Sequence, residues 1–283
     1  MIIDFRMRPP ARGFLNIGVY DNVERTAKLT ASFSMKQAPS VTKKSPELML
    51  QEMDEAGVTM GVIPGRNGHF KGTISNDDII KLLDDFPGRF VGIAGLNASK
   101  KTESLEEIHR TVLNGPLKGV CMEPGALDKP MYADDPRIYP IYEKCEKHQI
   151  PVILMLGGRA GPDITYSDPK IINRIAADFP KTNFIISHGG WPWVQQILGV
   201  CFFQKNIYLC PDMYLFNCSG CMDYIMAANN FMQDRFLYGS AYPLMPIVDC
   251  VKHFKGLFKP EVLPKLLWKN AAKVLKLNLP EEA

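Results

Sequence analysis

Short apolar segments and helical segments alternate eight times along this chain of 283 residues, and this alternation limits its possible folds more than any other feature. The apolar segments are continuous hydrophobic runs, whereas a strand with one face in water alternates apolar and polar residues. Continuous runs are typical of parallel strands that are covered on both faces. We predict strands at residues 1–5, 59–65, 90–96, 117–125, 151–158, 183–190, 206–214 and 235–243.

The segments between these strands carry the sequence signals of helices. In the first, Ser45 is a good N-cap, Pro46 suits the first helical position and Gly57 suits the end. In the second, Asn76 is expected to be the cap and Pro87 the stop. The other helices are predicted within residues 103–115, 135–149, 168–180, 191–204, 219–232, 246–258 and 260–277.

The count of eight units decides between two architectures with similar alternation. An open, doubly wound sheet would carry a glycine-rich phosphate-binding sequence after its first strand, and none is present here. We therefore predict an α/β fold, a (β/α)8 TIM barrel, as one domain over residues 1–283. Residues 9–44 are too long for an ordinary connection, so we expect an insertion that closes over the site or packs on a partner subunit.

Charge and hydropathy argue against several classes of partner. Lys and Arg number 33 against 30 Asp and Glu, with no basic stripe, so nucleic-acid binding is not expected. No stretch approaches the roughly 20 apolar residues of a membrane span, and the apolar start is too short for a signal peptide. A cytoplasmic protein with reduced cysteines is expected. The pair Cys218 and Cys221 lacks the second pair that a zinc site would need, so we interpret it as apolar filler.

In barrels of this kind, reactive residues lie where the strands end and the loops begin. Reading the strand ends in order gives a set of polar and aromatic candidates. They are Asp4, Arg6, Arg8, Arg66, Asn67, Glu123, Met155, Arg159, Asp163, His188, Trp191, Trp193, Asp212, Tyr214, Ala241 and Tyr242.

Arginines are concentrated among these candidates. Arg6, Arg8 and Arg66 follow two neighbouring strands, and Arg159 and Asn67 are expected to join them as substrate-binding residues. Gathering guanidinium groups is costly unless anions pair with them. Either the carboxylates of the chain neutralise them as a structural salt-bridge ring, or they bind the carboxylate of a small anionic organic substrate.

The end of the sixth strand carries His188, followed by two glycines, and we predict that it is the general acid or base. Asp212 or Glu123 would orient it or act as the second catalytic group. The aromatic side chains of Trp191, Tyr214 and Tyr242 would form the pocket wall. The plainer alternatives are a hydrogen-bonded core histidine, a loop-bracing aspartate and a glutamate that balances an arginine. His69, His109, His148 and His253 are assigned no chemistry.

Four segments together resemble the motifs of amidohydrolase-related proteins of the amidohydrolase superfamily. They are IIDF..R.R, IPVILMLGG, DPKIINRIAADFPKTNFIISHGGWPWV and RFLYGSAYP, and the resemblance runs from about Met1 to Leu275. It implies a TIM barrel and a homodimer or higher oligomer. Metal-dependent members of the family hold a divalent metal, often zinc, with two histidines of strand 1, one of strand 5 and an aspartate of strand 8. Those positions are Arg6, Arg8, Met155 and Ala241 here, and only His188 retains the family residue.

These replacements predict an enzyme without a metal or other cofactor. Zinc needs three or four N, O or S ligands, and arginine offers no lone pair. The resemblance then implies a hydrolase or lyase that opens a lactone, hydrolyses, decarboxylates or hydrates a small carboxylate-bearing substrate. Two alternatives stay open: a metal-dependent hydrolase that uses His188, Glu123 and Asp212, and a catalytically inactive barrel that binds small molecules.

Overall fold

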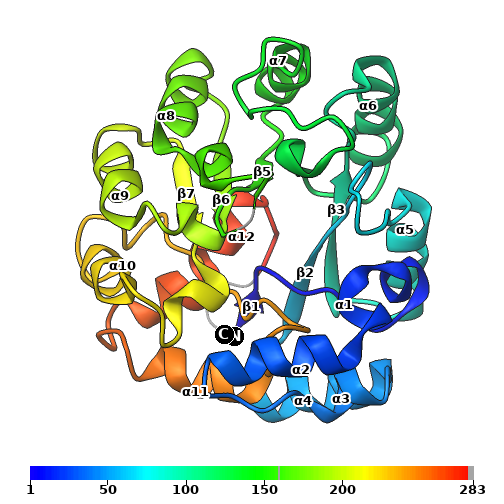
Figure 1. Cartoon of the computed structure of the whole chain (residues 1–283), viewed down its shortest axis with the longest axis vertical. Coiled ribbons are helices and arrows are strands. Elements are labelled where there is room, and N and C mark those ends of the chain that lie inside the picture. The colour runs from blue at the N-terminus through cyan, green and yellow to red at the C-terminus, as the bar shows by residue number, and fades with distance from the viewer. Residues whose placement is uncertain (159, 280–283) are drawn as a thin grey trace.

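Seven parallel strands form one continuous sheet in the order β1 to β7, and helices surround it (Figure 1). The computed structural model describes residues 1–158 and 160–279 of the chain. Each strand pairs in parallel with the next one in the sequence, as predicted for a barrel. The strands are β1 (Ile3–Asp4), β2 (Met60–Pro64), β3 (Phe90–Gly95), β4 (Val120–Met122), β5 (Val152–Met155), β6 (Phe184–Ser187) and β7 (Ile207–Cys210).

The predicted eighth strand, residues 235–243, closes the ring between β7 and β1, but it is not a regular strand. Leu237 N donates to Leu209 O on one side, and Phe5 N donates to Tyr238 O on the other, both at 2.9 Å. The ladder breaks at Ser240, whose backbone N–H donates to the Asp4 side chain at 2.9 Å instead of to a neighbouring strand. The barrel is therefore closed by isolated backbone bridges.

The helices form the outer layer of the barrel (Figure 1). They are α4 (Pro46–Ala56), α5 (Asn76–Asp85), α6 (Lys101–Glu107) with the π-helical turn η2 (Ile108–Leu113), α7 (Tyr139–His148), α8 (Pro169–Asp178), α9 (Val194–Phe203), α10 (Cys221–Ala228) and α11 (Ile247–Lys255). The π-helical turn η7 (Lys265–Lys269) and α12 (Asn270–Val274) follow at one end of the barrel. No helix in the described ranges is long and apolar enough to cross a membrane.

The predicted signals of α4 are confirmed, and the predicted cap of α5 is wrong. The Ser45 hydroxyl accepts from Leu48 N, Pro46 begins α4, and Gly57 ends it in the left-handed region with φ 73°. Ser75, not Asn76, caps α5. The Asn76 side chain is buried and bonds in both directions to the Gly95 backbone, so it ties α5 to β3.

The inserted segment after β1 is structured, not a loop. It contains η1 (Arg12–Asn16), α1 (Gly18–Asp21), α2 (Val23–Ser32) and α3 (Pro39–Thr42), and Figure 1 shows α1 and α2 beside the opening of the barrel. Its aromatic side chains Phe14, Tyr20 and Phe33 are buried. The Tyr20 hydroxyl donates to the carbonyl oxygen of Arg8 at 2.6 Å, which anchors the insertion to the end of β1.

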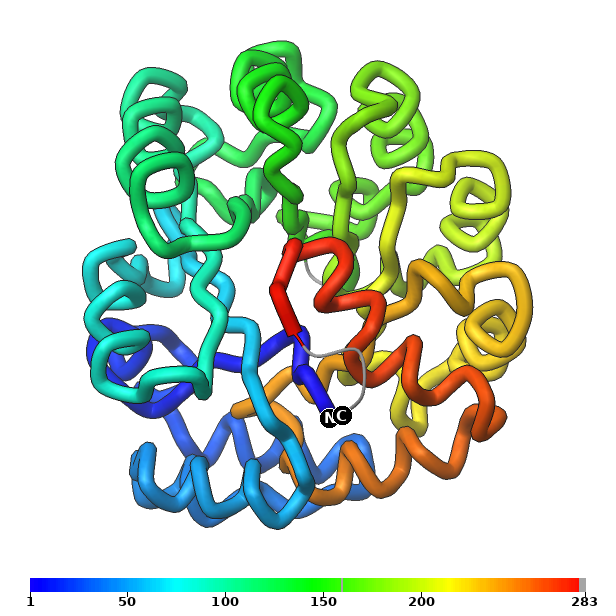
Figure 2. The backbone as a smooth tube through the Cα atoms, turned by 180° about the vertical axis from the view of Figure 1, so that it is seen from behind, coloured from blue at the N-terminus to red at the C-terminus, as the bar shows by residue number. Residues whose placement is uncertain are grey.

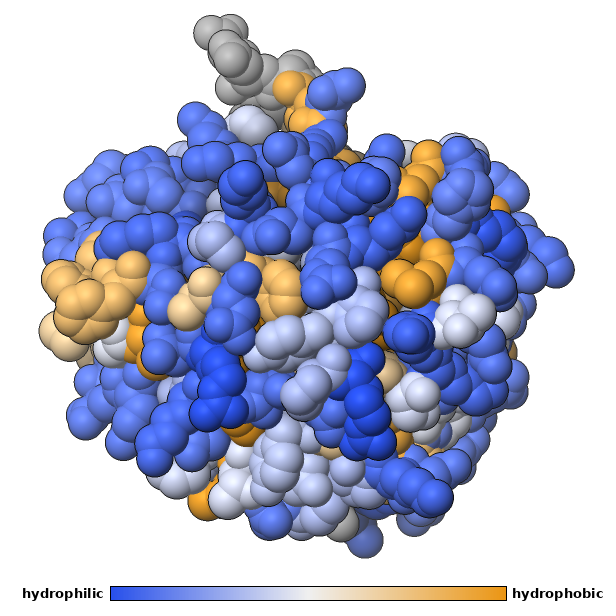
Figure 3. All heavy atoms as spheres, turned by 90° about the horizontal axis from the view of Figure 1, so that it is seen from above, coloured by the Kyte–Doolittle hydropathy of each residue, from blue (hydrophilic) through white to orange (hydrophobic). Residues whose placement is uncertain are grey.

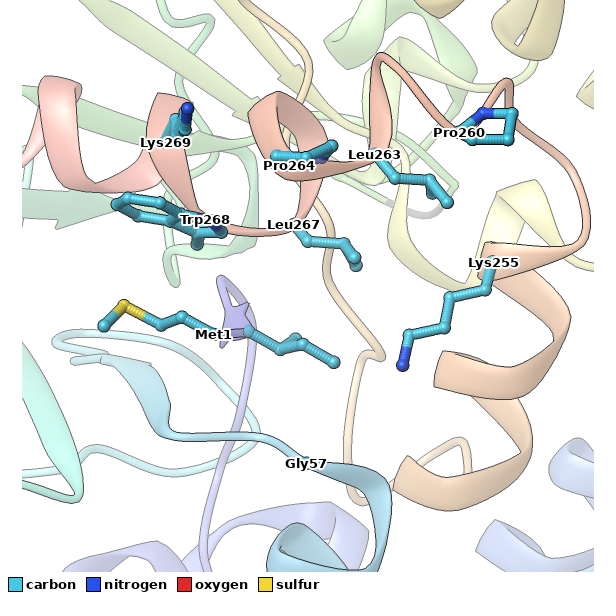
Figure 4. Close-up of a pocket in the computed structure, with 10 residues that line it drawn as sticks. Met1, Gly57, Lys255, Pro260, Leu263, Pro264, Leu267, Trp268 and Lys269 are labelled. Atoms are coloured by element: carbon cyan, nitrogen blue, oxygen red, sulfur yellow. The ribbon is translucent and has the colours of Figure 1, made fainter. Parts of the chain in front are cut away.

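The N-terminus lies at the other end of the barrel, which α12 crosses (Figure 2). A cavity of about 590 Å³ opens there between Met1, Gly57 and the apolar side chains of Leu263, Leu267 and Trp268 (Figure 4). The described residues that line it include lysines but no histidine or carboxylate.

Gly65, at the end of β2, is a position where only glycine fits. A Cβ there would lie 2.3 Å from the backbone N of Gly95 on β3, and backbone cannot move aside as a flexible side chain can. We expect Gly65→Ala to lower the free energy of unfolding by more than about 2 kcal/mol. Gly199→Ala in α9 is the matched control, because its Cβ meets nothing within 4 Å. It should be neutral or stabilising by up to about 1 kcal/mol. Urea denaturation of the two variants checks this, and equal stabilities would contradict it.

Candidate active site

A cavity of about 250 Å³ lies where the strands end, and the inserted segment forms part of its wall. The strand ends contribute mostly charged and aromatic groups, and the insertion contributes residues of α1 and α2. The lining residues are Arg6, Arg8, Gly18, Val19, Arg25, Leu29, Arg66, His69, Lys71, Glu123, Ala126, Met155, Gly157, Ala160, His188, Met213, Tyr214 and Leu244.

His188 follows β6 and is held by Asp212, which follows β7. Its Nδ1 lies 2.8 Å from Asp212 Oδ2, and its backbone N–H donates to the same carboxylate. Asp212 is also fixed by the N–H of Met213, at 2.6 Å, and its side chain is fully buried. Since Nδ1 faces the carboxylate, Nε2 is the ring nitrogen left for a ligand in the cavity, and no bond from a described residue occupies it.

The backbone at these strand ends adopts a conformation that non-glycine residues seldom use. His188, Asp212 and Ala241 have φ values of 67°, 46° and 66°. Such residues cost about 1–3 kcal/mol each and cluster at functional sites. For His188 and Asp212, this conformation places the two side chains within hydrogen-bonding distance of each other, so the strain accompanies the pairing of the two groups.

On the wall formed by β1, β2 and β4, Glu123 is surrounded by positive groups. Arg66 binds it in a bidentate manner, with Nε to Oε1 at 2.8 Å and an Nη to Oε2 at 3.1 Å. Arg8 donates to Oε1 at 3.0 Å, and His69 Nε2 lies 3.2 Å from Oε2. Burial alone would raise the pKa of Glu123, but Arg66, Arg8 and His69 outweigh it and hold this pKa well below its usual range. Glu123 is therefore ionised and saturated with donors.

The tautomer of His69 follows from its two contacts. Nδ1 accepts from the backbone N–H of Lys71 at 2.8 Å, so it carries no proton. Nε2 therefore bears the hydrogen that is donated to Glu123. Burial lowers the pKa of His69 despite the neighbouring carboxylate, which agrees with a neutral ring. Sequence reasoning missed His69; its place three residues after Arg66 in a loop at a strand end was the available signal.

Arg6 differs from the other two arginines, because no described carboxylate lies within ion-pair distance of it. Its side chain is only 3% exposed, lines the cavity, and has an Nε without a hydrogen-bond partner among the described residues. The nearby Asp4 accepts from the backbone N–H of Arg6, and burial raises the pKa of Asp4 to about 6. Three guanidinium groups thus share this wall with one saturated carboxylate, which leaves an excess of positive charge.

Two of the predicted aromatic wall residues belong to the site region, and one lies elsewhere. Tyr214 lines the cavity and meets the His188 ring edge-on at a centroid distance of 5.9 Å. Trp191 is not in the lining but stacks on Tyr214 at 4.8 Å, and its indole N–H donates to Ser219 O. Tyr242 lies outside the lining, because it is buried with its hydroxyl 2.8 Å from Ser40 Oγ.

The remaining predicted residues are spread over several environments. Asn67 is half-buried, Ala241 is buried, and neither residue lines the cavity. Asp163 is exposed and caps the turn η4 (Ile164–Ser167), so it does not neutralise the arginines. Arg159 lies outside the described residues. Met155, at the end of β5, lines the cavity. The orienting role belongs to Asp212, since Glu123 is bound by Arg8, Arg66 and His69.

The residues at the family's metal positions do not fit a divalent cation. Arg6 and Arg8 are cations without a lone pair, and Met155 and Ala241 offer no oxygen or nitrogen from their side chains. Among the described residues, no three His, Cys, Asp or Glu side chains are grouped as a metal site would require. The alternative donor set of His188, Glu123 and Asp212 is therefore not assembled either.

A family model described as amidohydrolase matches residues 3–277. The chain belongs to the amidohydrolase family. An uncharacterized TIM-barrel protein from Bordetella bronchiseptica is 43% identical, with a TM-score of 0.94, covering 97% of this chain and 98% of that one. Its likeness confirms the TIM barrel predicted from the sequence.

Two curated relatives match over part of their length. A 2-amino-3-carboxymuconate-6-semialdehyde decarboxylase from Dictyostelium discoideum is 33% identical over 72 residues, which is 25% of this chain and 20% of the relative. A 2-keto-4-carboxy-3-hexenedioate hydratase from Sphingobium sp. is 29% identical over 133 residues, which is 41% of this chain and 39% of the relative. The matches thus span about a fifth and two fifths of these relatives.

Removal of the Glu123 charge from this amidohydrolase should destabilise it strongly. In Glu123→Gln, the guanidinium groups of Arg8 and Arg66 would lose their common counter-charge in a buried site, and we expect a loss of about 3–5 kcal/mol. Asp54→Asn is the control, because its ion pair with Arg89 is exposed and should contribute less than about 1 kcal/mol. Urea denaturation measures both, and similar losses in the two variants would contradict a neutralising role for Glu123.

The raised pKa of Asp4 should make its contribution to stability depend on pH. The pKa of Asp4 rises from its ordinary value of 3.8 to about 6 in the barrel, so between these two pH values folding takes up a proton at Asp4. Wild type should therefore lose stability relative to Asp4→Asn as the pH rises from 4 to above 6, by up to about 3 kcal/mol. Urea denaturation at several pH values measures the difference in stability between wild type and Asp4→Asn. A difference that does not change with pH would contradict a buried carboxyl with a raised pKa.

Proposed function

We propose that this amidohydrolase is a metal-independent enzyme that acts on a small organic carboxylate by hydrolysis, lactone opening, decarboxylation or hydration. The observation that carries the proposal is that a cation, Arg6, and a group able to transfer a proton, His188, line the same cavity. Arg6 is a buried cation without an ion-paired carboxylate among the described residues, and His188 is a ring fixed by Asp212 with Nε2 left for a ligand.

The substrate carboxylate would bind Arg6. A guanidinium fork matches a carboxylate with two parallel hydrogen bonds, and such charge-assisted bonds are about twice as strong as neutral ones. Arg8 and Arg66 are already engaged by Glu123, so they would add positive potential and hold the wall rigid. The cavity of about 250 Å³ restricts the ligand to a small molecule.

His188 would transfer the proton. With Nδ1–H bonded to Asp212, the neutral ring presents the lone pair of Nε2 and acts as a base, and the protonated ring acts as an acid. The carboxylate of Asp212 would fix this tautomer and stabilise the imidazolium that forms. Arg6 would stabilise the negative charge that develops on oxygen or carbon in the transition state. The same arrangement serves an addition of water and a decarboxylation, which is why the proposal spans both.

Two further facts support this proposal. The names of both curated relatives, the decarboxylase and the hydratase, denote carboxylated compounds. Metal independence is supported by the donor set, because two guanidinium groups near the family's metal position would repel a dication. The alternative is a barrel that binds the same anions without converting them, and turnover assays distinguish the two functions.

The experiment compares wild type, Arg6→Met and His188→Ala in calorimetric titrations and in turnover assays with small di- and tricarboxylates. Arg6→Met should weaken anion binding at least about tenfold, since a charge-assisted pair contributes about 1.5–3 kcal/mol. It should also be at least as stable as wild type, because it removes a buried unpaired charge. His188→Ala should keep binding and lose turnover.

Arg137→Ala is the control for charge, because Arg137 is an exposed arginine paired with Asp135 outside the cavity. It should bind anions as wild type does. Equal binding by wild type and Arg6→Met would disprove the anion site. Turnover that survives in His188→Ala would disprove the role of the histidine, and stoichiometric metal in active protein by elemental analysis would disprove metal independence.

A further inference from the structure

The outer surface of α9 and α10 is unusually apolar for a helix layer that faces water. Five large apolar side chains are exposed there: Phe203 at 78%, Met222 at 69%, Met226 at 62%, Phe202 at 53% and Phe231 at 40%. We call these five residues the α9–α10 patch. Apolar side chains gather at the left edge of Figure 3, on the side of the barrel where Figure 1 places α9.

The members of the patch lie on and just after two helices that pack against each other, and its three aromatic rings are in contact. The ring of Phe202 lies 5.4 Å from the rings of both Phe203 and Phe231, so α9 and the segment after α10 are joined by aromatic contacts. Met222 and Met226 are four residues apart on α10 and therefore lie on one face of that helix. Single exposed apolar residues are common on soluble proteins, but a contiguous group indicates an interaction surface.

The sequences of the two helices show the same departure from an ordinary surface. Helix α9 contains no charged residue, and α10 contains only Asp223. By contrast, α5 in the same outer layer carries four aspartates and a lysine. Charged residues are depleted from the cores of protein interfaces, where Phe and Met are enriched. The composition of α9 and α10 is that of an interface core.

The size of the patch fits pairing with a second copy of the chain. A fully exposed large side chain presents on the order of 200 Å², so the five residues at these fractions expose roughly 600 Å². That is the upper limit for the largest patch on a typical monomer. Two such patches in contact would bury about 1,200 Å², the lower limit for a specific interface.

The charge pattern also favours a second copy over a partner of opposite charge. A two-fold interface joins one patch to itself, so it requires a surface that does not repel its own image. The α9–α10 patch meets this requirement because its five members are uncharged. At its border, the Lys205 ammonium lies 5.2 Å from the centre of the Phe202 ring, so a positive group is held at the rim.

We propose that the α9–α10 patch is the interface of a homodimer in which two copies pair through a two-fold axis. The proposal is independent of the chemistry proposed for the cavity, because no member of the patch lines it. The apolar groups bury one another, and the rim lysine stays in water.

Sedimentation equilibrium from low to high micromolar concentration tests the proposal with wild type, Phe203→Glu and Met226→Glu. Wild type should be a dimer, and each variant should raise the dissociation constant by at least about 100-fold, since it buries an unpaired charge. Because both side chains are more than half exposed, the variants should fold as wild type does, which circular dichroism and thermal denaturation check. Ile164→Glu is the control, since Ile164 is 50% exposed but lies outside the patch, and it should stay a dimer.

Three results would overturn the proposal. One is a wild type that stays monomeric at the highest concentration. Another is a dimer that Phe203→Glu and Met226→Glu do not weaken, which would place the interface elsewhere. The third is a monomer that binds phosphatidylcholine vesicles through the patch, with binding lost in both variants, which would make the occupant a lipid surface.

Discussion

The candidate site depends on the contact of the Glu123 carboxylate with Arg8 and Arg66, the arginines that follow β1 and β2. Glu123 binds Arg66 through both oxygens and Arg8 through one, and neutral His69 completes its shell. Without this carboxylate, the arginines that follow β1 and β2 would repel one another inside a barrel that buries them. With it, two of the three guanidinium groups are held in ion pairs, and Arg6 is the one of the three that has no ion-paired carboxylate among the described residues.

The cavity therefore has two chemically different sides. At one, Glu123 and its donors form a rigid wall of positive potential. At the other, Asp212 holds His188 so that one ring nitrogen faces the cavity. In the proposed chemistry, Arg6 would supply a fixed positive charge, and it offers donor hydrogens instead of the empty coordination positions of a metal ion. The proposed chemistry therefore depends on proton transfer beside a fixed cation.

Much of the fold was predictable because it depends on local patterns. Continuous apolar runs between capped helices predict buried parallel strands, and α4 begins and ends where Ser45 and Gly57 predict. The misplaced cap of α5 had a tertiary cause, since the Asn76 side chain binds the Gly95 backbone on a neighbouring strand. The irregular closing segment could not be foreseen either, because Asp4 takes the N–H that a regular ladder would have used.

The sequence by itself determined the barrel, the order of its strands and the residue types that follow them, because each of these depends on residue type and order along the chain. Only the tertiary structure decided which charges meet. It paired Asp212 with His188 and Glu123 with Arg8 and Arg66, and it turned Tyr242 away from the cavity toward Ser40. It also left Arg6 without an ion-paired carboxylate among the described residues. Coulomb energies depend on distances of a few ångströms between distant parts of the chain, and a list of strand ends does not contain those distances.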